Sequence, residues 1–191
     1  MRQSAFTAVY DANVLYPAPL RDLLMHLALT GMYRARWTAR IHEEWKRNLL
    51  LNRQDLGQTQ LDRTSMAMDK AIPDALVTGY EPLCEGLVLP DPDDRHVLAA
   101  AIRCNASVIV TFNLRDFPSA VLQPFDIEAV HPDDFIADLL DLDRAAVLEA
   151  VQAQRASLKN PPYTAQRLLE RLRAQGLAQS VKLLSEYERL I

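Results

Sequence analysis

The sequence predicts an α/β protein with a small, mostly parallel sheet flanked by helices, followed by an extension made only of helices. Two observations carry this prediction. Short apolar runs rich in β-branched residues alternate with helical patterns as far as about residue 131, an order that is typical of parallel sheets. From residue 134 onward, leucine and valine recur at helical spacing without any strand pattern. We therefore expect one domain over residues 1–133 and a helical extension over residues 134–191.

The first part of the chain contains two predicted strands and three predicted helices. Residues 5–10 and 33–37 have the short, largely apolar or alternating character of strands. Residues 20–30 place leucines at helical spacing, and residues 59–72 form a polar helical pattern. Between these two helices, Thr38 is a suitable N-cap for a helix that continues to about residue 51.

In the second part of the chain, predicted strands and helices alternate again, and only helices are predicted after that. Residues 86–89 predict a buried strand, and residues 92–104 predict an alanine-rich helix. Residues 107–111 are the strongest β-branched run and predict a central strand, to which residues 127–130 could add another. The extension shows only helical spacing, at residues 139–142, 147–151, 168–172 and 181–187.

Composition is that of an ordinary globular protein. The 191 residues are 49% apolar and 24% charged, which is too apolar for a disordered chain. The longest apolar run, residues 97–102, is far shorter than the ~18–20 residues of a membrane span. The amino terminus does not resemble a signal peptide, and Cys84 and Cys104 are too few for a disulfide framework. These features predict a cytoplasmic protein with no membrane partner.

Acidic residues follow several of the predicted strands. In open parallel sheets, ligands bind beyond the carboxyl ends of the strands. This is where we expect Asp11, the group of Asp91, Asp93 and Asp94, and Asp116. Each acid also has a purely structural explanation. Asp11 could be a turn residue, Asp116 could be an ordinary loop residue, and an acid before Pro92 is well suited to begin a helix.

The helix over residues 38–51 supplies one more acid. At 100° per residue, Glu44 lies on the border of the apolar face, whereas Glu43 points to the opposite side and should be solvated. Acids that converge raise one another's pKa unless a counter-charge is present. A single divalent cation would supply that counter-charge. An all-oxygen site suits Mg²⁺ or Mn²⁺ rather than zinc, and we expect His96, the nearest histidine, to lie on the surface.

Four ordered blocks of sequence carry a resemblance to a known family. They are VYDANVL at residues 9–15, Glu44, LPDPDDRHVL at residues 89–98, and VTFNLRDFP at residues 110–118. With these blocks the chain resembles the PIN-domain nucleases, and more closely the toxins of VapC-type toxin–antitoxin modules. The resemblance covers roughly residues 5–131 and implies a three-layer PIN-like fold.

The resemblance also implies an activity and a set of site residues. It implies a Mg²⁺- or Mn²⁺-dependent endoribonuclease, a hydrolase that acts as a toxin on structured RNA. The family's first three acids fall on Asp11, Glu44 and Asp94, but its usual fourth acid is replaced by Asn113. Asp116 is a candidate replacement, which gives four catalytic acids, and Asn113 could hold a metal-bound water. The implied metal ligands are Asp11, Glu44, Asp94, Asn113 and Asp116, with Thr111 orienting an acid or a water.

The distribution of charge is compatible with an RNA partner despite a net charge of -4. One basic cluster contains the candidate RNA-binding residues Arg34, Arg36, Arg40, Lys46 and Arg47. A second contains Arg155, Lys159, Arg167, Arg171 and Arg173, whereas residues 126–149 hold eight acids and one arginine. The resemblance further implies a homodimer and a cognate antitoxin, whose groove could be lined by the helices over residues 20–30 and 59–72.

Two alternatives differ in class from a nuclease. Asn113 at an acid position leaves open a non-catalytic PIN-like module that binds RNA or a protein. A phosphotransfer domain of the haloacid-dehalogenase type would also place an acid after the first strand. That type needs a second acid two residues later, where this chain has Asn13, so we set it aside. A receiver domain would need a lysine in the region where Asp116 lies.

Overall fold

The computed structural model describes residues 6–191, and its contacts divide the chain into two compact units. The first unit comprises residues 6–16 and 33–131, and the second comprises residues 17–32 and 132–191. The segment at residues 17–32 thus groups with the carboxyl-terminal helices, while the domain division between residues 133 and 134 stays a prediction. Residues 1–5, which include the first residue of the strand expected over residues 5–10, lie outside the described residues.

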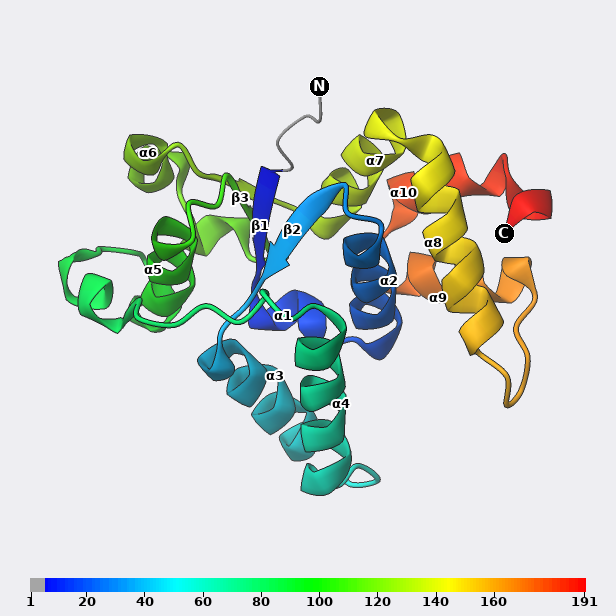
Figure 1. Cartoon of the computed structure of the whole chain (residues 1–191), viewed down its shortest axis with the longest axis horizontal. Coiled ribbons are helices and arrows are strands. Elements are labelled where there is room, and N and C mark those ends of the chain that lie inside the picture. The colour runs from blue at the N-terminus through cyan, green and yellow to red at the C-terminus, as the bar shows by residue number, and fades with distance from the viewer. Residues whose placement is uncertain (1–5) are drawn as a thin grey trace. The chain divides into compact units, whose positions relative to one another are not determined.

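A four-stranded parallel sheet forms the centre of the first unit (Figure 1). The strands are β1 (Phe6–Tyr10), β2 (Tyr33–Arg36), β3 (Val108–Val110) and β4 (Glu128–Val130), in the order β2-β1-β3-β4. The central strands β1 and β3 are fully buried from Ala8 to Tyr10 and at Ile109 and Val110, which accounts for their apolar sequence. Tyr10 pairs with Val110, so the carboxyl ends of β1 and β3 lie side by side. This confirms the predicted α/β class.

Helices and short 3-10 turns connect the strands. The first unit contains α1 (Ala12–Leu15), α3 (Ala39–Asn52), α4 (Gln58–Ala71), α5 (Arg95–Arg103) and α6 (Ser119–Leu122), with 3-10 turns η1 (Glu81–Gly86), η2 (Pro92–Asp94), η3 (Leu114–Asp116) and η4 (Gln123–Phe125). Thr38 is the predicted N-cap of α3, because its hydroxyl accepts a hydrogen bond from the Ile41 backbone N–H at 3.1 Å. Helix α5 is buried from His96 to Ala101, which places it in the core of the unit.

The strand predicted over residues 86–89 is wrong. Leu87 and Leu89 are buried while Val88 is 74% exposed, so the segment has the alternation of a strand. Within residues 6–191, however, no other strand pairs with it, and η1 occupies the residues up to Gly86. The helix expected from residue 92 begins instead as the turn η2, with the Asp91 carboxylate accepting the Asp93 N–H at 2.9 Å.

The second unit is entirely helical, as predicted for the extension. It contains α2 (Ala18–Leu29), α7 (Pro132–Leu142), α8 (Arg144–Ser157), α9 (Ala165–Ala174), α10 (Ala178–Ser185) and the turn η5 (Glu188–Leu190). Asp133 at the start of α7 accepts hydrogen bonds from the N–H groups of Gln179 and Ser180, both at 2.8 Å. The Gln154 side chain donates to the Pro19 carbonyl oxygen at 2.9 Å. These bonds join α7 to α10 and α8 to α2. None of the helices formed by residues 6–191 has the length and apolar content needed to cross a membrane.

A polar network inside the first unit holds α4 against α3. Asp69 accepts the Trp37 indole N–H at 2.7 Å, and its same oxygen lies 3.0 Å from Nε2 of His42. Nδ1 of His42 accepts the Trp45 indole N–H at 3.0 Å, so the ring proton is on Nε2 and His42 donates to Asp69. Trp37 and His42 are buried. Asp69 therefore satisfies two donors that have left water.

Replacing Asp69 with alanine is expected to lower the free energy of unfolding by about 2–6 kcal/mol, because each of the two buried donors left unpaired costs about 1–3 kcal/mol. Urea unfolding measures the change. Asp62→Ala is the control. Asp62 and Asp69 are similarly exposed, at 43% and 36%, but Asp62 pairs with the Lys46 ammonium rather than with two buried ring donors, and such a pair should contribute at most about 1 kcal/mol. Equal losses in the two variants would contradict a structural role for the network.

Candidate metal site at the sheet edge

Asp11 lies where β1 passes into α1, at the carboxyl edge of the sheet. It is 5% exposed. Its carboxylate accepts hydrogen bonds from the Ala12 N–H and the Thr111 hydroxyl, each at 2.7 Å, and from the Asn13 side-chain amide at 2.8 Å. Burial raises the pKa of Asp11, and the bonds from Thr111 and Ala12 oppose that rise. Three donors therefore hold one buried carboxylate in a fixed orientation.

Asp94 is the centre of a cluster of acids. Carboxylate oxygens of Asp91, Asp94 and Asp116 all lie within 4.8 Å of one another. The pKa of Asp94 is raised to about 7, first by burial and then by the charges of Asp11, Asp91, Asp116 and Glu44. The other three acids proposed as catalytic, Asp11, Glu44 and Asp116, therefore all act on Asp94, and so does Asp91, which also begins η2.

Glu44 approaches the cluster from α3 with a 19% exposed side chain, and its Oε1 lies 2.9 Å from Nε2 of His96 and 3.4 Å from Nε of Arg40. His96 is 1% exposed, so the surface position expected for it is wrong. Neither ring nitrogen of His96 makes an aligned hydrogen bond within the described chain, and the contact with Glu44 is close but not linear. Burial could have been predicted, because His96 immediately precedes the longest apolar run of the sequence. Glu43 is exposed, as predicted.

Asn113 and Asp116, the two candidates for the fourth acid position, contact each other. The Asn113 side-chain amide donates to the Asp116 carboxylate, and the Asn113 backbone N–H donates to the Thr111 hydroxyl at 3.0 Å. Asn113 lines the cavity that also contains Asp11 and Asp94, whereas Asp116 reaches Asp94 through the cluster of carboxylates. The structure therefore brings both candidates to the site, each from the η3 segment.

Two cavities open onto these residues. One of about 370 Å³ is lined by Asp11, Glu44, Asp94 and Asn113, together with Ala12, Asn13, Tyr16, Asn48 and Asn52. A second of about 390 Å³ shares Glu44, Asn48 and Asp94 and adds Arg40, Glu43, Arg47 and Asp93. The polar groups that line the first cavity are carboxylates, side-chain amides and the Tyr16 hydroxyl, without thiolate or imidazole. This donor set fits a hard divalent cation such as Mg²⁺ or Mn²⁺.

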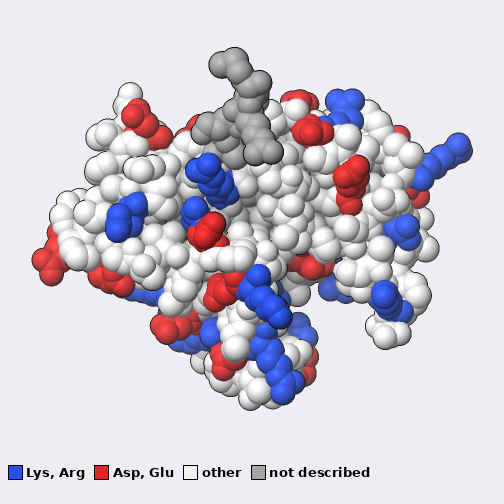
Figure 2. Space-filling view, in the orientation of Figure 1, with Lys and Arg blue, Asp and Glu red and all other residues white. Residues whose placement is uncertain are grey.

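Two of the five candidate RNA-binding residues lie at these cavities. Arg40 and Arg47 line the second cavity. Lys46 instead forms an ion pair with Asp62 at 2.7 Å and is 15% exposed, so its charge links α3 to α4. Arg34 and Arg36 lie on β2 and line neither cavity. Figure 2 shows Lys and Arg side chains mixed with acids over the α3–α4 pair.

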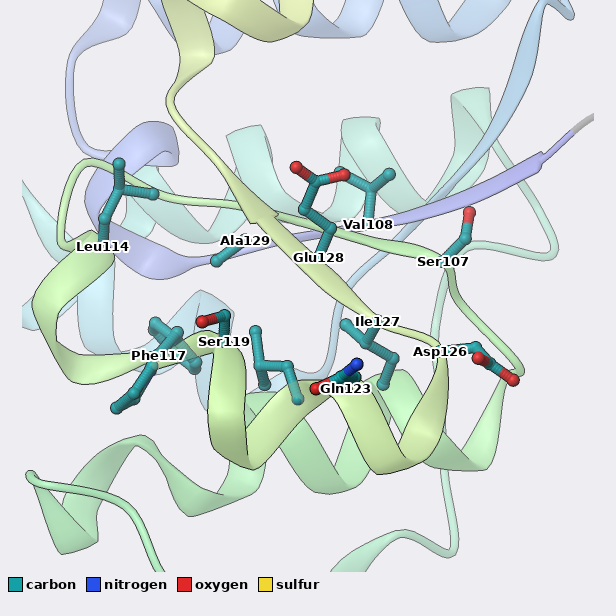
Figure 3. Close-up of a pocket in the computed structure, with 12 residues that line it drawn as sticks. Ser107, Val108, Leu114, Phe117, Ser119, Gln123, Asp126, Ile127, Glu128 and Ala129 are labelled. Carbon is teal, nitrogen blue, oxygen red and sulfur yellow. The ribbon is translucent and has the colours of Figure 1, made fainter.

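A larger cavity of about 940 Å³ lies elsewhere in the first unit, between β4 and the α6–η4 segment (Figure 3). Leu114, Phe117 and Ile127 contribute to its walls. Its two acids, Asp126 and Glu128, point in different directions rather than toward one point. This larger cavity therefore lacks a converging ligand set, and the acidic cavities are the better candidate site.

Comparison with known proteins identifies the family of the chain. A family model described as PIN domain matches residues 7–115, and one described as VapC50 C-terminal domain matches residues 132–186. The first match covers more than half of the chain, and the chain belongs to the PIN domain family. The resemblance in the sequence is thereby confirmed, and the second match shows that the helical extension has relatives of its own.

A curated relative is similar to part of the chain. It is the Mycobacterium tuberculosis protein named "Putative ribonuclease VapC50", which is 48% identical over 82 residues. The match covers 43% of this chain and 48% of that protein, so the chain matches about half the length of its relative. No solved structure matches the chain.

Proposed function

We propose that this protein is a divalent-metal-dependent endoribonuclease that acts as the toxin of a toxin–antitoxin system. The observation that carries the proposal is the meeting of Asp11, Glu44, Asp94 and Asp116 at one edge of a parallel sheet. There, burial and then the charges of these acids and Asp91 raise the pKa of Asp94 to about 7. Membership of the PIN domain family and the name of the curated relative support the same activity.

The proposed roles follow from the position of each side chain. Asp11, Glu44 and Asp94 would hold the cation, with Asp116 or Asn113 completing its shell. A bound Mg²⁺ or Mn²⁺ would activate water and neutralise charge on the in-line phosphoryl transition state. Thr111 and the Ala12 N–H keep the Asp11 carboxylate oriented. Arg40 and Arg47, which line the second cavity, would bind the phosphates of the RNA strand.

Cleavage of RNA by the purified chain tests the proposal. We expect cleavage with Mg²⁺ or Mn²⁺, none with EDTA, and none from Asp11→Ala with either metal. If wild type and Asp11→Ala cleave equally, the cleavage comes from another protein and the proposal fails. A silent Mn²⁺ titration by calorimetry would instead favour the non-catalytic module.

His96 is proposed as a positioning residue for Glu44. His96→Leu is expected to weaken Mn²⁺ binding by about 10- to 100-fold, the range for groups that orient metal ligands, while the free energy of unfolding stays equal or rises, since no buried polar ring remains. His96→Gln keeps a nitrogen donor near Glu44 and should recover most of the affinity. Calorimetry with Mn²⁺ and urea unfolding measure the two effects. Parallel losses of affinity and stability would contradict a positioning role.

The remaining features are predictions that rest on the resemblance. They are a cognate antitoxin, a homodimer and a cytoplasmic location. Light scattering at several protein concentrations tests the dimer, and the product of the neighbouring upstream gene is the first candidate antitoxin. Copurification of the two proteins would support the toxin role, and an unrelated neighbour would weaken it.

A further inference from the structure

Three arginines converge on one tyrosine in the second unit. Tyr163 lies in the segment between α8 and α9. The guanidinium carbon of Arg167 lies 4.2 Å from the centroid of its ring, and that of Arg171 lies 5.8 Å away. Nη1 of Arg171 donates to the Tyr163 hydroxyl at 2.8 Å, and Nη1 of Arg155 donates to the Tyr163 carbonyl oxygen at 3.3 Å. Tyr163 thus contacts the guanidinium groups of three arginines, one from α8 and two from α9.

No acid neutralises this cluster. Within residues 6–191, none of its arginines forms a salt bridge. Glu170, the one acid within residues 155–173 of the sequence, accepts a hydrogen bond from Gln166 at 3.0 Å instead. Arg167 and Arg171 stand four residues apart on the exposed face of α9, where like charges repel each other. Positive charges that are held close together without a counter-ion repel each other, so the binding of an anionic ligand is favourable.

The charges of the segment are segregated. Residues 155–173 contain five basic residues and one acid, whereas residues 132–149 contain six acids and one arginine. Figure 2 shows blue side chains near the carboxyl-terminal end of α8. A ligand with a single charge would need only one arginine. A row of planar guanidinium groups matches a chain of repeated phosphates, because each group can donate two parallel hydrogen bonds to one phosphate.

We propose that the surface formed by Arg155, Arg167 and Arg171 around Tyr163, the Tyr163 surface, binds the phosphate backbone of RNA. This inference rests on the proposed function, since RNA is its substrate, and adds a second contact site in a unit that contributes no acid to the sheet-edge site. Tyr163 preorganises the arginines, which reduces the conformational entropy lost when they bind phosphate.

RNA binding by the full chain in EDTA tests the Tyr163 surface without cleavage. The probe is a short fluorescein-labelled single-stranded RNA, measured by fluorescence anisotropy. The double variant Arg167→Gln/Arg171→Gln should bind about tenfold more weakly, and the slope of log affinity against log salt should fall by about 1.4, or about 0.7 for each phosphate that is no longer neutralised. Both side chains are exposed, so folding should persist, which circular dichroism verifies.

Two further variants control the result. Arg144 makes the same type of arginine–tyrosine contact within the acid-rich segment of residues 132–149. Its guanidinium carbon lies 5.4 Å from the centroid of the Tyr187 ring, and Nη1 donates to the Tyr187 hydroxyl at 2.9 Å. Arg144→Gln should leave RNA affinity unchanged. Glu170→Gln removes the acid of the cluster and should strengthen binding, an effect opposite in sign to that of the double variant.

The outcomes separate this inference from the proposed function. If the double variant binds RNA as tightly as wild type, with the same salt slope, the inference is overturned even when wild type cleaves RNA. An equal loss in Arg144→Gln also overturns it, since the effect would then reflect net charge alone. If binding falls in the double variant only, the inference holds, even if the chain cleaves no RNA and the proposed function fails.

Discussion

Asp94→Asn is expected to lower the rate of RNA cleavage by on the order of 10²- to 10³-fold, the loss found when one preorganised stabilising group is removed from an active site. Asp94 carries this expectation because it is the acid on which the charges of Asp11, Asp91, Asp116 and Glu44 converge. Cleavage of a labelled RNA at saturating Mn²⁺ measures the rate. The same substitution should weaken Mn²⁺ binding in a calorimetric titration.

Asp93→Asn is the matched control. Asp93 is adjacent in sequence and exposed, and it lines the second cavity without belonging to the cluster of Asp91, Asp94 and Asp116. Asp94 makes no side-chain hydrogen bond at the start of α5, so Asn at this position removes charge rather than a helix cap. Comparable losses in both variants would show that the general acidity of the segment matters, rather than the position of Asp94.

Raising the pH from about 5 to 7.5 is expected to destabilise the cation-free protein through Asp94. The pKa of Asp94 is about 7 in the folded protein, against 3.8 for an ordinary aspartate. Between these values the folded state binds more protons than the unfolded state, so the free energy of unfolding falls as pH rises. Because Asp94 is partly exposed, solvent screening reduces the effect, and we expect about 1 kcal/mol, or a decrease of about 2–4 °C in Tm.

Thermal unfolding of wild type and Asp94→Asn isolates this contribution from those of other carboxyls. The Tm of wild type, relative to that of the variant, should fall across the pH window in EDTA. Mn²⁺ at the upper end of the window should restore it, because a bound cation favours the ionised carboxylate. A constant difference in Tm between the two proteins over this range would mean that the pKa of Asp94 is not raised.

Local patterns were sufficient for most of the fold. The β-branched run at residues 107–111 and the apolar run at residues 5–10 predicted the central strands, because a parallel strand buried on both faces requires continuous apolar residues. Thr38 predicted the start of α3, because its cap bond joins residues three apart. The same reasoning failed at residues 86–89. Alternating burial is a local property, whereas a strand needs a partner whose position the local sequence does not encode.

For the candidate site, too, some features follow from the local sequence and others only from the packing of the whole protein. The sequence by itself determined the residue types that chemistry requires: acids after the strands, Glu44 on the border of its helix, and an amide at Asn113. Only the tertiary structure decided that these acids meet at Asp94, that His96 is buried beside Glu44, and that α2 groups with the carboxyl-terminal helices. The physical reason is that burial and electrostatic coupling depend on distances between residues far apart in the chain, and those distances are set by packing of the whole protein.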